Sequence, residues 1–286
     1  MLKRRTDLAV EATQLWQEQA GETTQLRGVQ ARDSVREGYK VTTVRILDES
    51  GAQALGKPVG TYITVELDGL LRREEDAFPR AARALAAELR GLLDLKEGDA
   101  VLVAGLGNRA ITPDGIGPKA ADYTLVTRHL VEQVPEQFGA FRPVSALAAG
   151  VLGTTGMESG ELISAVVEKT RPACVLAVDA LASRSLRRVG RTVQLSDTGI
   201  VPGSGVGNHR MALNRETLGV PVIAIGVPTV VDAATLACDL LSEAGREDLD
   251  PAALSGAGEN LIVTPREVDT QVGDLAKVIG YGIDLA

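Results

Sequence analysis

Two aspartates in this 286-residue chain follow apolar runs that are typical of buried strands. Asp114 comes after the run at 99–107, within the stretch GLGNRAITPDGIGPKAAD, and Asp179 lies near the end of the run ACVLAVDAL at 173–181. In an open parallel sheet, functional sites form outside the carboxyl ends of the strands. We therefore expect Asp114 and Asp179 at the same edge of a sheet, as a candidate carboxylate pair.

Such a pair has a chemical use. Two carboxyl groups a few ångströms apart share one proton, because both cannot ionise together. One then acts as general base on a water and the other as general acid towards a carbonyl. If Asp114 begins a helix, the helix dipole favours its ionised form and leaves the proton on Asp179.

Both aspartates also have simpler roles open to them. Asp114 suits the N-cap of a helix over 114–133, and Asp179 suits a cap on a following turn. The rival acids in the chain are Glu66, Asp68 and Asp197. The spacing alone leaves these alternatives open.

Other catalytic sets are poorly represented. The chain has two histidines, His129 and His209, and neither an H-x-x-x-H nor a C-x-x-C pair, so no zinc site is indicated. Cys174 and Cys238 lie in apolar surroundings and are expected to be buried structural thiols of a reducing compartment. We expect neither a metal nor another cofactor.

Two glycine-rich stretches resemble nucleotide loops. GLGNRA at 105–110 fits the relaxed pattern G-x-G-x-x-A after a strand, but Ile111, Thr112 and Pro113 delay the helix that should face a pyrophosphate. PGSGVGN at 202–208 lacks the G-K-[ST] ending of a phosphate loop and reads as a turn. Nucleotide binding therefore remains a minor alternative.

Composition excludes several classes of function. The net charge is -8, which argues against a general nucleic-acid binder. Hydrophobic residues make up 44% of the chain and aromatic residues 3%, so a large core must consist of aliphatic side chains. No apolar stretch approaches the roughly 20 residues that span a bilayer, and the N-terminus lacks the apolar region of a signal peptide. We expect a soluble cytoplasmic protein.

The pattern of elements predicts an α/β fold. Apolar strands are expected at 99–107, 142–153, 173–181 and 220–231, and helices at 8–20, 78–95, 114–133, 157–170, 232–244 and 265–285. Their alternation predicts βαβ units and a mainly parallel sheet covered on both faces. The alternating segments 39–47 and 60–67 predict an early β-hairpin, which with the region 186–215 adds to this sheet. One domain over 1–286 is expected.

With these residues in view, the chain resembles the germination protease family, endopeptidases of spore-forming bacteria that degrade small acid-soluble spore proteins. The resemblance covers nearly the whole chain. It rests on the stretches RRTDLAVEA, GLGNRAITPDGIGPKAAD, VTRHL, GTTGMES, VDALASRS, DTGIVPGSGVGNHR and LGVPVIAIGVPTVVDA, which occur in this order.

The resemblance implies an atypical aspartic endopeptidase whose catalytic residues match Asp114 and Asp179. It implies a three-layer fold similar to the hydrogenase-maturation proteases, with a twisted, mostly parallel sheet between helices. It further implies a homotetrameric zymogen in the spore core. The substrates are small acid-soluble spore proteins, so contact with nucleic acid would be indirect.

The resemblance also implies self-processing. Family substrates are cut after the first acid of a motif similar to T-E-F-A-S-E, and TDLAVE at 6–11 imitates it. Cleavage would fall between Asp7 and Leu8 and release a short prosegment, residues 1–7. Two alternatives remain: a metal-dependent maturation endopeptidase, which would need His209 beside the acids, and a non-enzymatic nucleotide-binding regulatory protein that uses GLGNRA.

Overall fold

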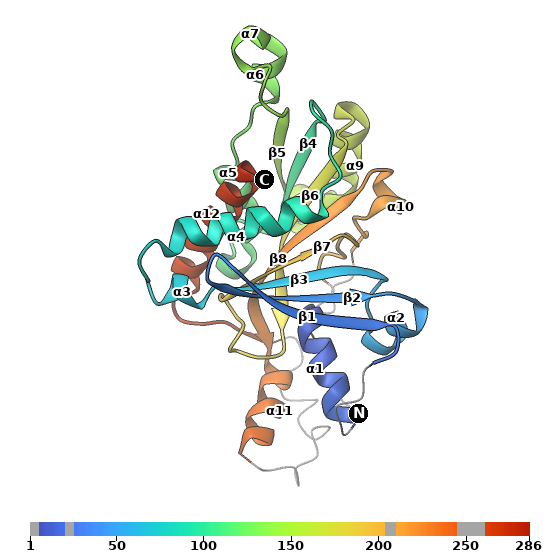
Figure 1. The fold of residues 1–286 in the computed structure, drawn as a ribbon, viewed down its shortest axis with the longest axis vertical. Coiled ribbons are helices and arrows are strands. Elements are labelled where there is room, and N and C mark those ends of the chain that lie inside the picture. Colours follow the sequence, from blue (N-terminus) through green and yellow to red (C-terminus); the bar gives the residue numbers. More distant parts are fainter. Residues whose placement is uncertain (1–5, 21–25, 204–209, 245–260) are drawn as a thin grey trace.

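The computed structural model describes residues 6–20, 26–203, 210–244 and 261–286. Within these residues, one mixed nine-stranded sheet lies between two layers of helices (Figure 1). The strands are β1 Val29–Arg36, β2 Tyr39–Ile46, β3 Gly60–Glu66, β4 Val101–Leu106, β5 Val144–Gly150, β6 Cys174–Ser183, β7 Thr192–Ser196, β8 Val222–Asp232 and β9 Ile262–Val263. The expected α/β class is confirmed.

The sheet has a parallel part and an antiparallel part. Its order is β1-β2-β3-β7-β8-β6-β4-β5, with β9 paired to β8. The pairs β5–β4, β4–β6 and β6–β8 are parallel, and they are the four apolar runs that the sequence predicts. These strands are apolar on both sides because helices cover both faces. The candidate residues Asp114, after β4, and Asp179, within β6, therefore belong to the parallel part.

The early strands differ from the predicted hairpin. β2 and β3 do pair antiparallel, but the helix α2 (Glu49–Leu55) lies between them in the chain. The close hairpin partner of β2 is β1, which the sequence analysis missed. Its turn consists of Glu37 and Gly38, both with positive φ, as in type I′ hairpins. β1 is largely exposed at the sheet edge, so it carries no apolar alternation.

The region 186–215 supplies β7, which pairs antiparallel with both β3 and β8. This strand joins the early antiparallel strands to the parallel part of the sheet. The prediction that 39–47, 60–67 and 186–215 add to the parallel sheet is confirmed.

The described helices are α1 Ala9–Ala20, α2 Glu49–Leu55, α3 Asp68–Leu71, α4 Ala77–Leu92, α5 Ile116–Tyr123, α6 Arg128–Gln133, α7 Pro135–Phe138, α8 Leu152–Thr155, α9 Ser159–Thr170, α10 Arg215–Leu218, α11 Ala233–Glu243 and α12 Val268–Leu285, with the 3₁₀ helix η1 at Thr112–Asp114. The expectation of one helix over 114–133 is wrong. Thr124 turns to an extended conformation, and the Thr127 hydroxyl binds the Arg142 carbonyl and the Val144 N–H at the start of β5. The tie to β5 separates α5 from α6.

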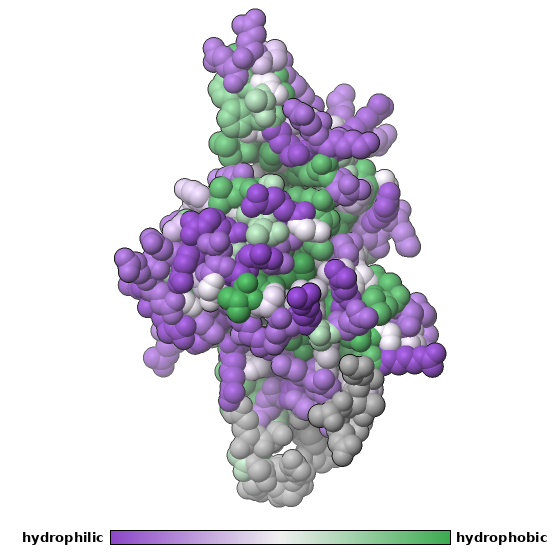
Figure 2. All heavy atoms as spheres, in the orientation of Figure 1, coloured by the Kyte–Doolittle hydropathy of each residue, from purple (hydrophilic) through white to green (hydrophobic). Residues whose placement is uncertain are grey.

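Each face of the sheet has its own core. Helices α4, α5 and α12 cover one face with an aliphatic cluster centred on Leu85, Ile116 and Ile279. Helices α9 and α10 cover the other face over the parallel strands, and α1 and α2 cover it over β2 and β3. Figure 2 shows the α4 side as mainly hydrophilic, with hydrophobic residues on the projecting α6–α7 segment.

The two cysteines are buried and unpaired, as the sequence predicts. Burial raises the pKa of the Cys174 thiol to about 11. This thiol is therefore protonated at neutral pH and fits a structural role.

Candidate active site

The strands β4 and β6 bring the two aspartates to one edge of the sheet. They pair in parallel from Val101 opposite Cys174 to Gly105 opposite Val178. Asp179 is the next residue of β6, beyond the last pair with β4. β6 continues to Ser183 and stays paired with β8, so Asp179 lies inside a strand and does not cap a turn. The turn-cap role considered for Asp179 is therefore wrong.

The loop after β4 folds back and presents Asp114. Its Oδ2 accepts a hydrogen bond of 2.7 Å from the Asn108 N–H. Gly107 has φ +105°, and a Cβ there would lie 2.1 Å from the Asp114 carbonyl oxygen. The close contact explains why the stretch needs a glycine at this position. The N-cap role considered for Asp114 is wrong, because α5 begins at Ile116 and Asp114 caps none of its N–H groups.

Gly117 allows the loop and α5 to pack closely on the sheet. A Cβ on Gly117, in the first turn of α5, would lie 2.3 Å from the Leu106 carbonyl oxygen and 2.4 Å from that of Val178. The backbone of α5 therefore rests directly on β4 and β6. Gly107 and Gly117 therefore serve close backbone packing around Asp114.

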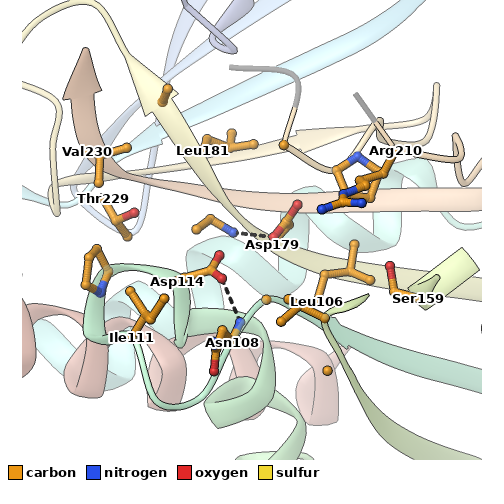
Figure 3. A pocket seen from close by; sticks show the side chains of 18 of the residues that line it. Leu106, Asn108, Ile111, Asp114, Ser159, Asp179, Leu181, Arg210, Thr229 and Val230 are labelled. Atoms are coloured by element: carbon orange, nitrogen blue, oxygen red, sulfur yellow. Dashed lines mark hydrogen bonds between the residues drawn. The ribbon is translucent and has the colours of Figure 1, made fainter. Parts of the chain in front are cut away.

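Asp114 and Asp179 line the same cavity, of about 360 Å³ (Figure 3). The view shows their side chains between the loop after β4 and the strand β6. Other residues of the lining are Asp7, Leu106, Asn108, Ile111, Glu158, Leu181, Ala182, Arg210, Thr229 and Val230. Asp114 and Asp179, which the sequence predicts as a candidate pair, therefore line one cavity.

The two carboxyl groups differ in their surroundings. Asp179 is 5% exposed, and burial raises its pKa well above the ordinary value; the negative charge of Asp114 adds to this, and the Ala180 N–H opposes it. Asp114 is half-buried, and burial raises its pKa while the Asn108 N–H lowers it. The favoured state has the proton on Asp179 and the charge on Asp114, because Asp179 is the more deeply buried of the two.

The motif TDLAVE occupies the same edge of the sheet. The Asp7 N–H donates to the Ala182 carbonyl at 2.9 Å, and the Ala182 N–H donates to Asp7 Oδ2 at 2.8 Å. Both bonds join the edge of β6 that β4 leaves unpaired beyond Val178. Leu8 is fully buried and packs with Val10 and Leu181. The Asp7–Leu8 bond therefore lies beside the cavity that holds the two aspartates.

Glu11, the second acid of this motif, is 2% exposed. Its carboxylate accepts hydrogen bonds from the backbone N–H groups of Arg184 at 2.7 Å and Ser185 at 3.2 Å. The Arg188 guanidinium lies 3.5 Å away, and the Thr6 hydroxyl donates at 2.5 Å. Glu11 was not among the predicted site residues, although its place as the second acid of the motif is the signal that identifies it.

The rival acids lie outside the cavity. Asp197 accepts a hydrogen bond from the Thr61 N–H, and Glu66 and Asp68 lie near the guanidinium groups of Arg188 and Arg191. Among the described residues, no group of three His, Cys, Asp or Glu side chains could hold a metal ion. His129 is exposed, and His209 lies outside the described residues, as does most of the loop 202–208.

Two polar residues of the cavity were not expected from the sequence. The Thr229 hydroxyl is buried and has no hydrogen-bond partner in the part of the chain that the structure describes. Arg210 forms an ion pair of 2.9 Å with Glu158 at the rim.

In the described ranges, no helix is both long and apolar enough to cross a membrane.

Comparison with known proteins identifies the family of the chain. A sequence model described as germination protease matches residues 9–247. Germination protease of Caldanaerobacter subterraneus subsp. tengcongensis is 46% identical, over 99% of this chain and 93% of the relative. Those of Clostridium perfringens and Bacillus cytotoxicus are 43% and 40% identical, over 100% and 99% of this chain and 95% and 93% of the relatives. The chain therefore belongs to the germination protease family, a family of peptidases.

Proposed function

We propose that this chain is an aspartic-type endopeptidase that cleaves small acid-soluble spore proteins during germination. Family membership supports peptidase activity. The observation that supports the aspartic type is the shared cavity of Asp114 and Asp179, beside which the cleavage-like motif TDLAVE lies. The resemblance to the family further supports a homotetrameric zymogen in the spore core, as one protease domain over 1–286.

The charges of the two carboxyl groups suit hydrolysis. Ionised Asp114 takes a proton from a water as its oxygen attacks the substrate carbonyl carbon, and protonated Asp179 supplies the proton that the departing nitrogen requires. At the end of the reaction the pair again holds one proton. Its titration would appear as two macroscopic pKa values that belong to the pair.

Self-processing should follow the same chemistry. We expect purified full-length protein to cut itself between Asp7 and Leu8, giving a new N-terminus at Leu8 in intact-mass and N-terminal sequence analysis. Asp7→Ala removes the carboxylate that accepts the Ala182 N–H. This loss is worth about 1.5–3 kcal/mol for a charged partner, so the cut should slow by about 10-fold or more.

The control for this experiment is Glu136→Ala on the exposed helix α7, which should cut at the unmodified rate. A cut at another position, or an Asp7→Ala variant as fast as the control, would contradict the assignment of the Asp7–Leu8 bond.

The groups that bind the Glu11 carboxylate give an independent prediction. Arg188→Met removes the guanidinium group that lies 3.5 Å from the buried Glu11 carboxylate. Because Glu11 keeps its two backbone N–H donors, we expect a loss of about 1–2 kcal/mol of stability and slower self-cleavage, rather than complete unfolding. Thermal unfolding and the rate of appearance of the Leu8 N-terminus measure both effects.

Arg90→Met, at an exposed position of α4, is the matched control and should leave both quantities unchanged. If Arg188→Met behaved like Arg90→Met, Arg188 would have no part in holding Glu11.

The two alternatives have distinct tests. Cleavage of a T-E-F-A-S-E peptide that stops after exhaustive chelation and returns with added metal would favour the metal-dependent maturation endopeptidase of the related fold. Tight nucleotide binding in calorimetry without proteolysis would favour the regulatory protein. The loop GLGNRA offers little to a phosphate, because the Asn108 N–H already binds the Asp114 carboxylate.

A further inference from the structure

The carbonyl oxygen of Asp7 receives hydrogen bonds from two side chains that are distant in sequence. Lys57 Nζ donates at 2.9 Å, and Gln194 Nε2 donates at 3.2 Å. This oxygen belongs to the Asp7–Leu8 peptide bond, so it would carry the negative charge that develops when water attacks the carbonyl carbon. Two side-chain donors on one carbonyl oxygen are the arrangement by which enzymes stabilise such a charge.

Gln194 contacts the chain on both sides of this bond. Its Nε2 donates to the Asp7 carbonyl, and its Oε1 accepts a hydrogen bond of 2.8 Å from the Ala9 N–H. Gln194 is 7% exposed and lies on β7, between β3 and β8. A side chain held on a central strand keeps its position as the bond reacts, which is what preorganised stabilisation requires.

Lys57 supplies a cation. It follows Gly56, which ends α2 in the left-handed conformation, and the Lys57 N–H donates to the Ala52 carbonyl, so the backbone at this position is fixed. Burial lowers the pKa of the Lys57 ammonium, while the charges of Asp7 and Glu11 raise it. Lys57 is half-buried, and an ammonium group partly shielded from water interacts more strongly with a developing oxyanion than one in bulk solvent.

Asp7 lies between two cavities, one lined by Asp114 and Asp179 and the other by Lys57 and Gln194. Asp7 lines the cavity of Asp114 and Asp179, and it also lines a second one, of about 260 Å³, with Lys57 and Gln194. The charge of Asp7 also contributes to the raised pKa of Asp179, as expected for neighbouring groups. A water in the cavity of the two aspartates can therefore approach a face of the carbonyl group while Lys57 and Gln194 contact its oxygen.

We propose that Lys57 and Gln194 are catalytic residues that bind the scissile carbonyl oxygen and stabilise its negative charge, an inference that rests on the proposed cleavage by Asp114 and Asp179. The oxygen of water bonds to the Asp7 carbonyl carbon, its proton passes to Asp114, and the carbonyl electron pair moves onto the oxygen held by Lys57 and Gln194. When this pair returns, the bond to the Leu8 nitrogen breaks, and that nitrogen takes the proton of Asp179. The products are a carboxyl group on Asp7 and an amine on Leu8.

The test is the rate of self-cleavage in Lys57→Met and Gln194→Met variants of the full chain. We expect each variant to slow the cut about 10²-fold or more, as the loss of one oxyanion donor does in other hydrolases. Lys57→Arg, which keeps a cation, should recover part of the rate. Lys169→Met, on the exposed surface of α9, is the control and should cut at the unmodified rate.

A purely structural role for Lys57 is tested separately. In an uncleaved Asp179→Asn background, Lys57→Met should leave the hydrogen exchange of residues 6–11 unchanged, because the two bonds between Asp7 and Ala182 remain. Faster exchange of this segment, matching the loss of rate, would show that Lys57 only anchors the segment and would overturn the proposal.

Failure of this inference is distinguishable from failure of the proposed function. If Asp179→Asn is inactive while Lys57→Met and Gln194→Met cut at the rate of Lys169→Met, the oxyanion site alone is refuted. If the Asp114→Asn and Asp179→Asn variants both still cut, the aspartate mechanism is refuted, and the oxyanion assignment that rests on it fails as well.

Discussion

Asp179→Asn is expected to lower kcat/KM for a T-E-F-A-S-E peptide by about 10²–10⁴-fold, and Asp114→Asn should do the same. General acid–base groups typically contribute this much. An amide can neither take a proton from water nor return one to the departing nitrogen. Either variant therefore removes the shared proton on which the pair depends, while Asn keeps the oxygen that accepts the Ala180 or Asn108 N–H.

The same Asp179→Asn variant should be more stable than the unmodified protein at neutral pH. In the folded chain burial raises the pKa of Asp179 well above its ordinary value, so the unfolded chain loses this proton at lower pH. Stability therefore falls as the pH rises from about the unfolded value of 3.9 towards the raised folded pKa. Replacing the carboxyl by an amide removes this decline, and thermal unfolding between pH 4 and pH 8 measures it.

The matched control is Asp197→Asn, since Asp197 is exposed and its bond with the Thr61 N–H can be kept by an amide oxygen. It should retain activity and the unmodified pH dependence of stability. Full activity in both Asp114→Asn and Asp179→Asn would refute the catalytic pair. If the Asp179→Asn variant were less stable than the unmodified protein at pH 7, the buried Asp179 carboxyl group would not lower the stability of the fold at that pH.

Gly107→Ala is expected to lower activity about 10²-fold and to reduce the free energy of unfolding by about 2–4 kcal/mol. The added Cβ would lie 2.1 Å from the Asp114 carbonyl oxygen, and the φ of +105° is itself unfavourable for alanine. The loop must move, and the Asp114 carboxylate moves with it. Peptide cleavage and denaturant unfolding measure the two effects.

Gly273→Ala in α12 is the control for this substitution, because no atom of the described residues outside the helix's own backbone lies within 4 Å of the added Cβ. It should keep full activity and gain about 0.5–1 kcal/mol, as expected for alanine in place of glycine in a helix. If Gly107→Ala retained full activity, the loop geometry would not be what positions Asp114.

The parallel strands could be predicted because their signal is local. Strands covered on both faces are apolar along their whole length, so 99–107 and 173–181 were recognisable without their partners. The strands β1 and β7 were not identified as strands. β1 lies exposed at the sheet edge and has no apolar alternation, and β7 owes its place to partners on either side, β3 and β8.

The break in the predicted helix 114–133 has a similar cause. Its residues suit a helix, but the Thr127 hydroxyl binds backbone groups of Arg142 and Val144, which lie 15 and 17 residues further along. Local propensity is weak enough for such tertiary contacts to override it.

The sequence by itself determined the α/β class and the apolar strands, and it made Asp114 and Asp179 a candidate pair, because burial and the polarity of parallel strands follow from residue type and order. Only the tertiary structure decided that both aspartates line one cavity, and that Lys57 and Gln194 meet the carbonyl of Asp7. These contacts join residues that are 50 and 187 positions apart, and no local pattern encodes them. They exist because the fold brings β7 and the end of α2 to the segment that lies along β6.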